Sequence, residues 1–182
     1  MRAGILKLAL LGAALWGVPS MAADHLDCAL ALRTPDLDKA VFAQYRAGGN
    51  IGEALMKERG SDFKACATTH KWSGSATESA ARVLFGQILV AGVTQDFIER
   101  GLPVERLGAA LAGFVAGQNP ERQSKLAEGE LDEATITPLL DTLTDLGIVT
   151  TDQLDKELGG KIGEYLSAYA NASVYRMRFR TQ

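Results

Sequence analysis

Residues 76–98 read ATESAARVLFGQILVAGVTQDFI, and this stretch decides the fold class. Its apolar side chains recur at the spacing of a helix face, at Ala80, Val83, Leu84, Ile88 and Ala91. That spacing matches the 3.6-residue turn, so we expect an amphipathic α-helix here. Long alternating runs of β-branched residues are absent from the sequence, which argues against a sheet. The sequence therefore predicts an all-α protein.

Capping residues and glycines divide the rest of the chain into further helices. Thr34-Pro35 and Asn50 have the residue types that begin helices, and Gly60 is expected to end one helix before Ser61 opens the next. The helices expected outside the central stretch cover residues 35–47, 51–59, a short segment from 61, 103–117, 138–146 and 152–178.

Some local signals predict interruptions inside these helices. Ser75 is a candidate cap for the central helix, and Gly92 favours a kink or a restart within it. Thr137-Pro138 is the expected start of the leucine-rich helix that follows. Gly159-Gly160 costs the long C-terminal helix on the order of 2 kcal/mol in helix propensity, so a break is possible there.

The chain divides into a predicted signal peptide, residues 1–22, an N-terminal helical subdomain, 23–75, and a multi-helix bundle, 76–182. The last two are expected to form one compact unit that ends in a long helix. Apolar stripes on the bundle helices form either an internal core or an interaction face. The candidate face residues are Leu84, Ile88, Leu107, Leu111, Phe114, Tyr165 and Tyr169.

The N-terminus has the three parts of a secretory signal. Arg2 and Lys7 supply positive charge, an apolar run follows, and Ser20 and Ala22 are small residues at the positions that a signal peptidase reads. A retained membrane anchor is the alternative, but the apolar run falls short of the roughly 20 residues that cross a bilayer. We therefore expect a periplasmic protein without stable membrane insertion after cleavage.

Charge argues against nucleic acid as a partner. The formal net charge is −3, and loss of Arg2 and Lys7 with the signal lowers it by two units, to −5. Phosphate backbones are bound by clustered Lys and Arg, which an acidic chain of this kind does not offer overall. A protein partner, either a second copy or another periplasmic protein, is expected instead.

The two cysteines, Cys28 and Cys66, predict one disulfide. An even pair in an oxidising compartment usually forms a bond, and this one would close a loop of 38 residues. Two free thiols, one of them catalytic, are the alternative. The C-x-x-C spacing of thioredoxin-like redox sites is absent from the sequence.

Catalytic and cofactor signals are sparse, and the sequence predicts no catalytic, cofactor or metal residue. The best loop constellation is residues 68–75, where His70 stands beside several hydroxyl side chains. A base next to a hydroxyl could activate a nucleophile, whereas the same residues could form a polar turn that caps the next helix. The acidic side chains within residues 128–133 are interpreted as a solvent-exposed surface.

The two ends of the expected mature chain carry weaker signals. Cleavage after Ala22 would leave Ala23-Asp24-His25, whose amine, amides and imidazole could bind Cu(II) or Ni(II) in a square plane. Residues 174–180 alternate apolar and basic side chains. They are either a tail that contacts a membrane surface or a partner, or a frayed helix end whose cations suit the helix dipole.

The order of helices from residue 80 onward resembles the N-terminal dimerisation module of periplasmic FKBP-type peptidyl-prolyl isomerases of the macrophage-infectivity-potentiator kind. The matching segments are Leu84-Phe85-Gly86-Gln87, Gly101-Leu102-Pro103-Val104-Glu105 with Ala116-Gly117, Leu131-Asp132-Glu133 with Leu139-Leu140, and the helix from Asp152. Departures are Ala110 and Gly113-Phe114 in the second helix, an insert over 119–129, and the lack of an isomerase domain. The resemblance implies dimerisation and chaperone-like binding without isomerase activity.

These observations favour a secreted, non-enzymatic protein-binding or chaperone-like protein, in keeping with the dimer that the resemblance implies. An immunity or inhibitor protein that neutralises a secreted toxin or hydrolase is the first alternative, on architectural analogy alone. An enzyme or metal-binding protein that uses His70 or the mature N-terminus is the second.

Overall fold

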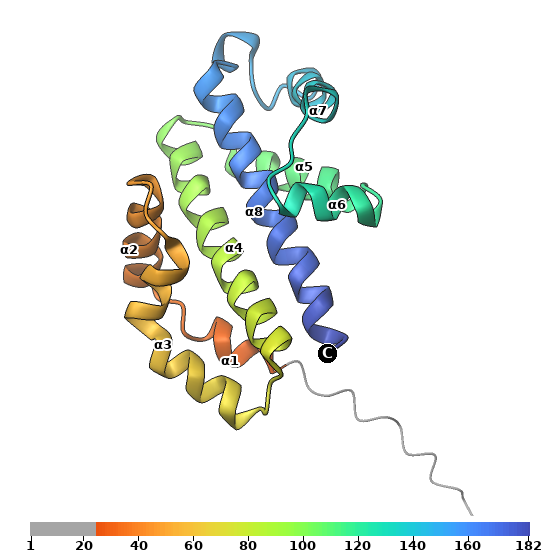
Figure 1. The fold of residues 1–182 in the computed structure, drawn as a ribbon. Coiled ribbons are helices and arrows are strands. Elements are labelled where there is room, and N and C mark those ends of the chain that lie inside the picture. The colour runs from red at the N-terminus through yellow and green to blue at the C-terminus, as the bar shows by residue number, and fades with distance from the viewer. Residues whose placement is uncertain (1–24) are drawn as a thin grey trace, which may run out of the picture.

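The computed structural model describes residues 25–182, so the predicted signal peptide lies outside the described residues. The described chain is helical, contains no strand and ends in a long helix, which confirms the predicted all-α class (Figure 1). The elements are α1 (Leu26–Leu30), α2 (Pro35–Arg46), α3 (Ile51–Thr69), α4 (Gly74–Glu99), α5 (Val104–Ala116), α6 (Pro120–Ala127), α7 (Glu133–Asp145), the 3-10 turn η1 (Thr151–Gln153) and α8 (Lys156–Arg180).

Six of the described helices begin at a polar side chain that accepts a hydrogen bond from a backbone N–H three residues on. These bonds satisfy donors that the first helical turn leaves free. Thr34 and Asn119 each do so directly before a proline, whose fixed φ suits the first turn. The other four caps are Asn50, Ser73, Asp132 and Asp155.

Two predicted interruptions and one predicted helix start are wrong. α3 continues through Gly60, and the side chains of Leu55 and Phe63 on either side of it are buried. α4 begins at Ser73 rather than Ser75 and continues through Gly92, where the ring of Phe42 occupies the space of a side chain. Burial of a helix face outweighs a glycine that costs about 1 kcal/mol.

The boundaries of α7 and α8 also differ from the prediction. α7 begins at Glu133, capped by Asp132, and therefore contains Pro138 in its interior. α8 begins at Lys156, after η1, and Gly159-Gly160 lies within it without a break. In both cases an aspartate cap fixes the first turn and the buried leucines that follow hold the helix in place.

α4 and α8 form an antiparallel pair at the centre of the molecule (Figure 1). Their backbones approach closely at Gly86, where an added Cβ would lie only 2.6 Å from the carbonyl oxygen of Ala168. α4 is long and apolar enough by composition to cross a membrane, yet five other helices of the same chain pack against it. Packing on several sides is typical of the central helix of a helical core.

The buried side chains form two clusters, and both include residues of α4 and α8. One cluster lies among α4, α5, α7 and α8 and contains Phe97, Leu107 and Leu143. The other lies among α1, α2, α3 and α4 and contains Leu26, Val41 and Phe63. The predicted disulfide between Cys28 and Cys66 is present and joins α1 to α3.

Candidate functional site

The predicted interaction face lies mostly inside the chain. Five of its seven residues are covered by neighbouring helices: Leu84, Ile88, Leu107 and Leu111 are fully buried, and Tyr165 is 7 % exposed. Phe114 and Tyr169 are partly exposed beside the same core cluster. These stripes therefore form an internal core in this chain, and any contact with a second molecule there would involve Phe114 and Tyr169.

A groove of about 550 Å³ lies beside α8 and is a candidate binding site. Elements far apart in the sequence contribute to it: α2, α4, the end of α6, the start of α7 and α8. Its volume falls within the range of roughly 300–1,000 Å³ that is typical of ligand sites. Its apolar walls are formed by Tyr45, Phe85, Leu89, Leu131, Ile136 and Ala168.

Small side chains on α8 give the groove its depth. Gly160, Gly163 and Ser167 line it at steps of three and four residues, so they share one helix face. An added Cβ at Gly160 would meet no atom within 4 Å, and one at Gly163 would lie 3.0 Å from Cδ1 of Leu131. The absence of side chains at these two glycines leaves part of the α8 backbone open to the groove.

Asn171 continues the same face and carries an unsatisfied polar atom. The residue is 7 % exposed, and its Nδ2 donates a hydrogen bond to the carbonyl oxygen of Ala127 at 3.1 Å. Its Oδ1 is buried and has no hydrogen-bond partner. Leaving such an acceptor unpaired costs about 1–3 kcal/mol. Buried polar atoms without partners are uncommon, and the described residues contain one other, Nε1 of Trp72.

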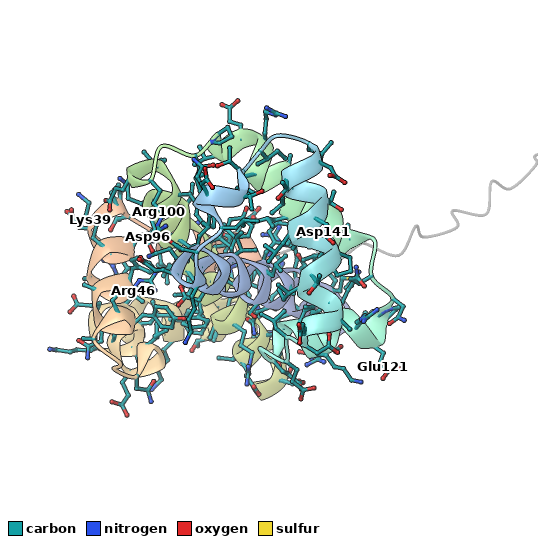
Figure 2. The ribbon with its side chains drawn as sticks, turned by 90° about the horizontal axis from the view of Figure 1, so that it is seen from above. Lys39, Arg46, Asp96, Arg100, Glu121 and Asp141 are labelled. Atoms are coloured by element: carbon teal, nitrogen blue, oxygen red, sulfur yellow. A yellow bond between two sulfur atoms is a disulfide. The ribbon has the colours of Figure 1, made fainter. Side chains whose placement is uncertain are left out.

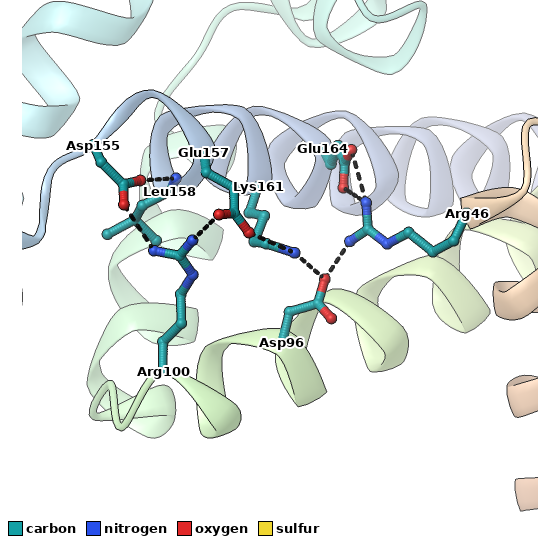
Figure 3. A network of polar contacts seen from close by, with 8 residues as sticks. All are labelled: Arg46, Asp96, Arg100, Asp155, Glu157, Leu158, Lys161 and Glu164. Atoms are coloured by element: carbon teal, nitrogen blue, oxygen red, sulfur yellow. Dashed lines mark hydrogen bonds and ion pairs between the residues drawn. The ribbon is translucent and has the colours of Figure 1, made fainter.

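Charged side chains join α2, α4 and α8 beside Glu164, which lines the groove (Figure 3). Arg46 forms ion pairs with Asp96 and with Glu164, the latter at 2.8 Å, and Lys161 contacts Asp96 at 2.7 Å. Burial by itself would lower the pKa of Arg46, but the charges of Glu164 and Asp96 raise it. Glu164 also lines the groove, so this network fixes one of its walls.

Tyr45 of α2 also lines the groove. Burial raises its pKa, the charge of Glu164 raises it further, and Arg46 partly opposes both effects. The Arg46 guanidinium lies 5.6 Å from the centre of this ring. Tyr45 therefore remains an uncharged apolar wall with a polar edge over the ordinary pH range.

A second set of ion pairs holds the first turn of α8. Arg100 contacts Asp155 at 3.2 Å and Glu157 at 2.5 Å. The backbone N–H of Leu158 and then the guanidinium of Arg100 lower the pKa of Asp155. Seen from above, Arg46, Asp96 and Arg100 lie on one side of α8, whereas Asp141 and Glu121 lie on the other (Figure 2). The two sets of pairs place α8 relative to α2 and α4.

Among residues 25–182, no hydrogen bond joins the ring of His70 to a hydroxyl group. His70 ends α3, and its ring stacks on that of His25 with 4.2 Å between the ring centres. The nearby hydroxyl of Ser73 accepts from the N–H of Ala76 and so caps α4. The loop thus caps the next helix, as in the alternative interpretation, but the cap is Ser73 rather than Ser75.

The remaining predicted sites can be placed only in part. Ala23 and Asp24 lie outside the described residues, so the copper or nickel site stays a prediction, although His25 itself lies at the start of α1. The side chains of the acidic segment 128–133 are exposed, apart from Leu131. Within residues 25–182 no group of three or more His, Cys, Asp or Glu is arranged to hold a metal ion.

Sequence reasoning missed the groove, although part of its signal is local. The small residues at 160, 163 and 167 follow helical spacing, and the interpretation of Gly159-Gly160 as a possible helix break left this shared face unnoticed. The other wall could not be found this way, because Tyr45 and Leu131 reach the groove only through the tertiary fold.

Comparison with known proteins identifies no relative of this chain. No protein-family model, no curated protein and no solved structure matches this chain. The resemblance to the isomerase dimerisation module therefore stays a prediction, and the geometry of the groove carries the functional argument.

Proposed function

We propose that this protein is a non-enzymatic, exported binding protein that receives an apolar segment of a partner protein in the groove beside α8. The observation that carries this proposal is an apolar groove floored by the glycine face of α8 and containing the unpaired Oδ1 of Asn171. Apolar walls supply the driving force for association, and a few polar atoms set orientation.

The polar groups of the groove indicate the chemistry of the segment. Glu128 lines the groove, is exposed and forms no ion pair with another described residue. Glu164 adds a second carboxylate, which Arg46 neutralises. A segment with an Arg or Lys beside its apolar side chains would therefore complement the rim. A donor on the same segment that reached Asn171 would remove the cost of its unpaired oxygen.

A peptide segment fits better than a compact metabolite for two reasons. The groove is open to solvent along one side, and its walls come from five parts of the chain rather than from a closed cavity. The role agrees with the chaperone-like binding that we expected from the sequence. It does not require the predicted dimer, because the stripes assigned to that contact are mostly buried.

Filling the groove tests the proposal. Gly160→Phe places a ring where an added Cβ meets no atom within 4 Å, so the helix is expected to tolerate it. Gly113→Phe is the matched control, since Gly113 lies in α5, is exposed, and also has open space around an added Cβ. Circular dichroism and thermal melting establish that both variants remain folded.

Two assays measure the binding of apolar molecules by the wild type and by each variant. One is suppression of the heat-induced aggregation of citrate synthase, and the other is the fluorescence of the neutral apolar dye Nile red. We expect the wild type and Gly113→Phe to suppress aggregation and bind the dye, and Gly160→Phe to lose both activities. Equal behaviour of the two variants, or no effect of the wild type in either assay, would contradict the proposal.

A further inference from the structure

The first and last described parts of the chain meet at one end of the molecule, where the loop before α4 also lies (Figure 1). A series of ring contacts links them. His25 stacks on His70 at 4.2 Å, His70 lies 6.1 Å from Trp72, and Trp72 packs edge-on against Phe179 at 5.2 Å. The last turn of α8 is therefore fixed against the start of α1.

This end is rich in arginine although the protein as a whole is acidic. The sequence after Glu164 contains Arg176, Arg178 and Arg180 and no acidic residue. The guanidinium groups of Arg82 and Arg178 both lie over the ring of Tyr175, at 4.7 and 4.6 Å from its centre. Tyr175 thus gathers cations from α4 and α8 onto one surface.

Apolar side chains are interleaved with these cations. Met177 is 52 % exposed, and Phe179 is partly exposed where it packs on Trp72. Favourable interaction with the helix dipole accounts for cations in the last turn of α8, and Arg82 on α4 pairs with Glu78 at 3.0 Å. Neither effect accounts for an exposed methionine between two arginines. Basic residues combined with exposed apolar side chains are typical of surfaces that bind the lipid–water interface.

We propose that this surface, formed by Arg176, Met177, Arg178 and Arg180 and called the basic end, docks on bilayers that contain anionic phospholipids. Each Lys or Arg near an anionic bilayer contributes about a fivefold gain in partitioning. The groove residues on α8 run from Gly159 to Asn171, and the basic end begins beyond them at Arg176. The docking is peripheral and needs no helix to enter the bilayer.

Vesicle flotation of residues 23–182, which include the whole described fold, tests this directly. The vesicles are pure phosphatidylcholine or phosphatidylcholine mixed with phosphatidylglycerol. Trp72 is the sole tryptophan of residues 23–182, and it lies at the basic end, so its emission reports docking as well. We expect binding only to the phosphatidylglycerol vesicles, with loss of binding at high salt.

Three triple variants separate charge from folding. Arg176→Gln with Arg178→Gln and Arg180→Gln is expected to lower the partition coefficient on the order of 100-fold. The same three positions changed to Lys should retain binding, because the charge is kept. The control changes Lys39, Lys57 and Lys156 to Gln, which removes equal charge from exposed positions elsewhere and should have no effect.

Three results would overturn the proposal. They are equal binding to both kinds of vesicle, unchanged binding of the Arg→Gln triple variant, and binding to duplex DNA as tight as to phosphatidylglycerol vesicles. The last result would identify a general polyanion site instead of a lipid surface.

Discussion

Replacing Gly86 with alanine tests whether close contact between α4 and α8 is what holds the core together. An added Cβ would lie 2.6 Å from the carbonyl oxygen of Ala168 and 2.9 Å from the backbone nitrogen of Ala172. Both atoms belong to the backbone of α8, so neither can rotate away. Restoring an ordinary contact of 3.4 Å to the oxygen requires the helices to separate locally by 3.4 − 2.6 = 0.8 Å.

The expected cost follows from two opposing effects. Overpacking a core costs about 1–3 kcal/mol, and the upper end applies here because the contacted atoms are backbone. Alanine also has a better helix propensity than glycine, by about 1 kcal/mol. We therefore expect Gly86→Ala to lower the free energy of unfolding by about 2 kcal/mol. For a chain of this size that corresponds to a fall in Tm of about 4–8 °C.

Gly160→Ala is the matched control, because the same substitution in α8 meets no atom within 4 Å. It should raise the free energy of unfolding by up to about 1 kcal/mol, through helix propensity alone. Urea denaturation followed by far-UV circular dichroism measures both variants. If Gly86→Ala were as stable as the wild type, the two helices would not be in close contact at Gly86, and the steric argument would fail.

Two further predictions concern the disulfide and the start of α8. Changing Cys28 and Cys66 to Ser should lower the free energy of unfolding by about 4 kcal/mol, the chain-entropy value for a separation of 38 residues, and reduction of the wild type should give the same urea midpoint. Asp155 has a pKa below its usual 3.8, so the stability it supplies is present at neutral pH and is lost as the pH falls through its lowered value. Asp155→Asn keeps an acceptor for the N–H of Leu158 without a titrating charge. The stability difference between wild type and variant should therefore shrink in acid, and a difference independent of pH would contradict the assignment.

Local sequence signals predicted the helices well where a cap decides the boundary. Thr34 and Asn50 both cap the helices expected of them, because capping involves residues within three positions of each other. The same signals gave wrong helix boundaries where the burial of side chains determines how far the helix extends. Gly60 and Gly92 weaken a helix locally, but their helices are held by buried side chains on either side, and those contacts come from distant parts of the chain.

The candidate site was harder to predict than the fold. The disulfide and the leucine-rich stripes could be read from residue types, but whether a stripe is core or surface depends on which helix covers it. Arg46 and Asp96 are 50 residues apart, and no local pattern pairs them. The groove depends on such long-range pairs, so it becomes visible only in three dimensions.

The pairing of α4 with α8 has a consequence for how the chain acquires its structure. Residues 156–180 of α8 are synthesised well after residues 74–99 of α4, so the apolar flank of α4 has no α8 to cover it until synthesis has passed residue 180. Contacts between segments so far apart in sequence form slowly, and exposed apolar helices are prone to aggregation in the meantime. The export that we propose would require the chain to remain unfolded until it has crossed the membrane. Late arrival of α8 would delay folding in this way, so the order of the helices itself would favour transport.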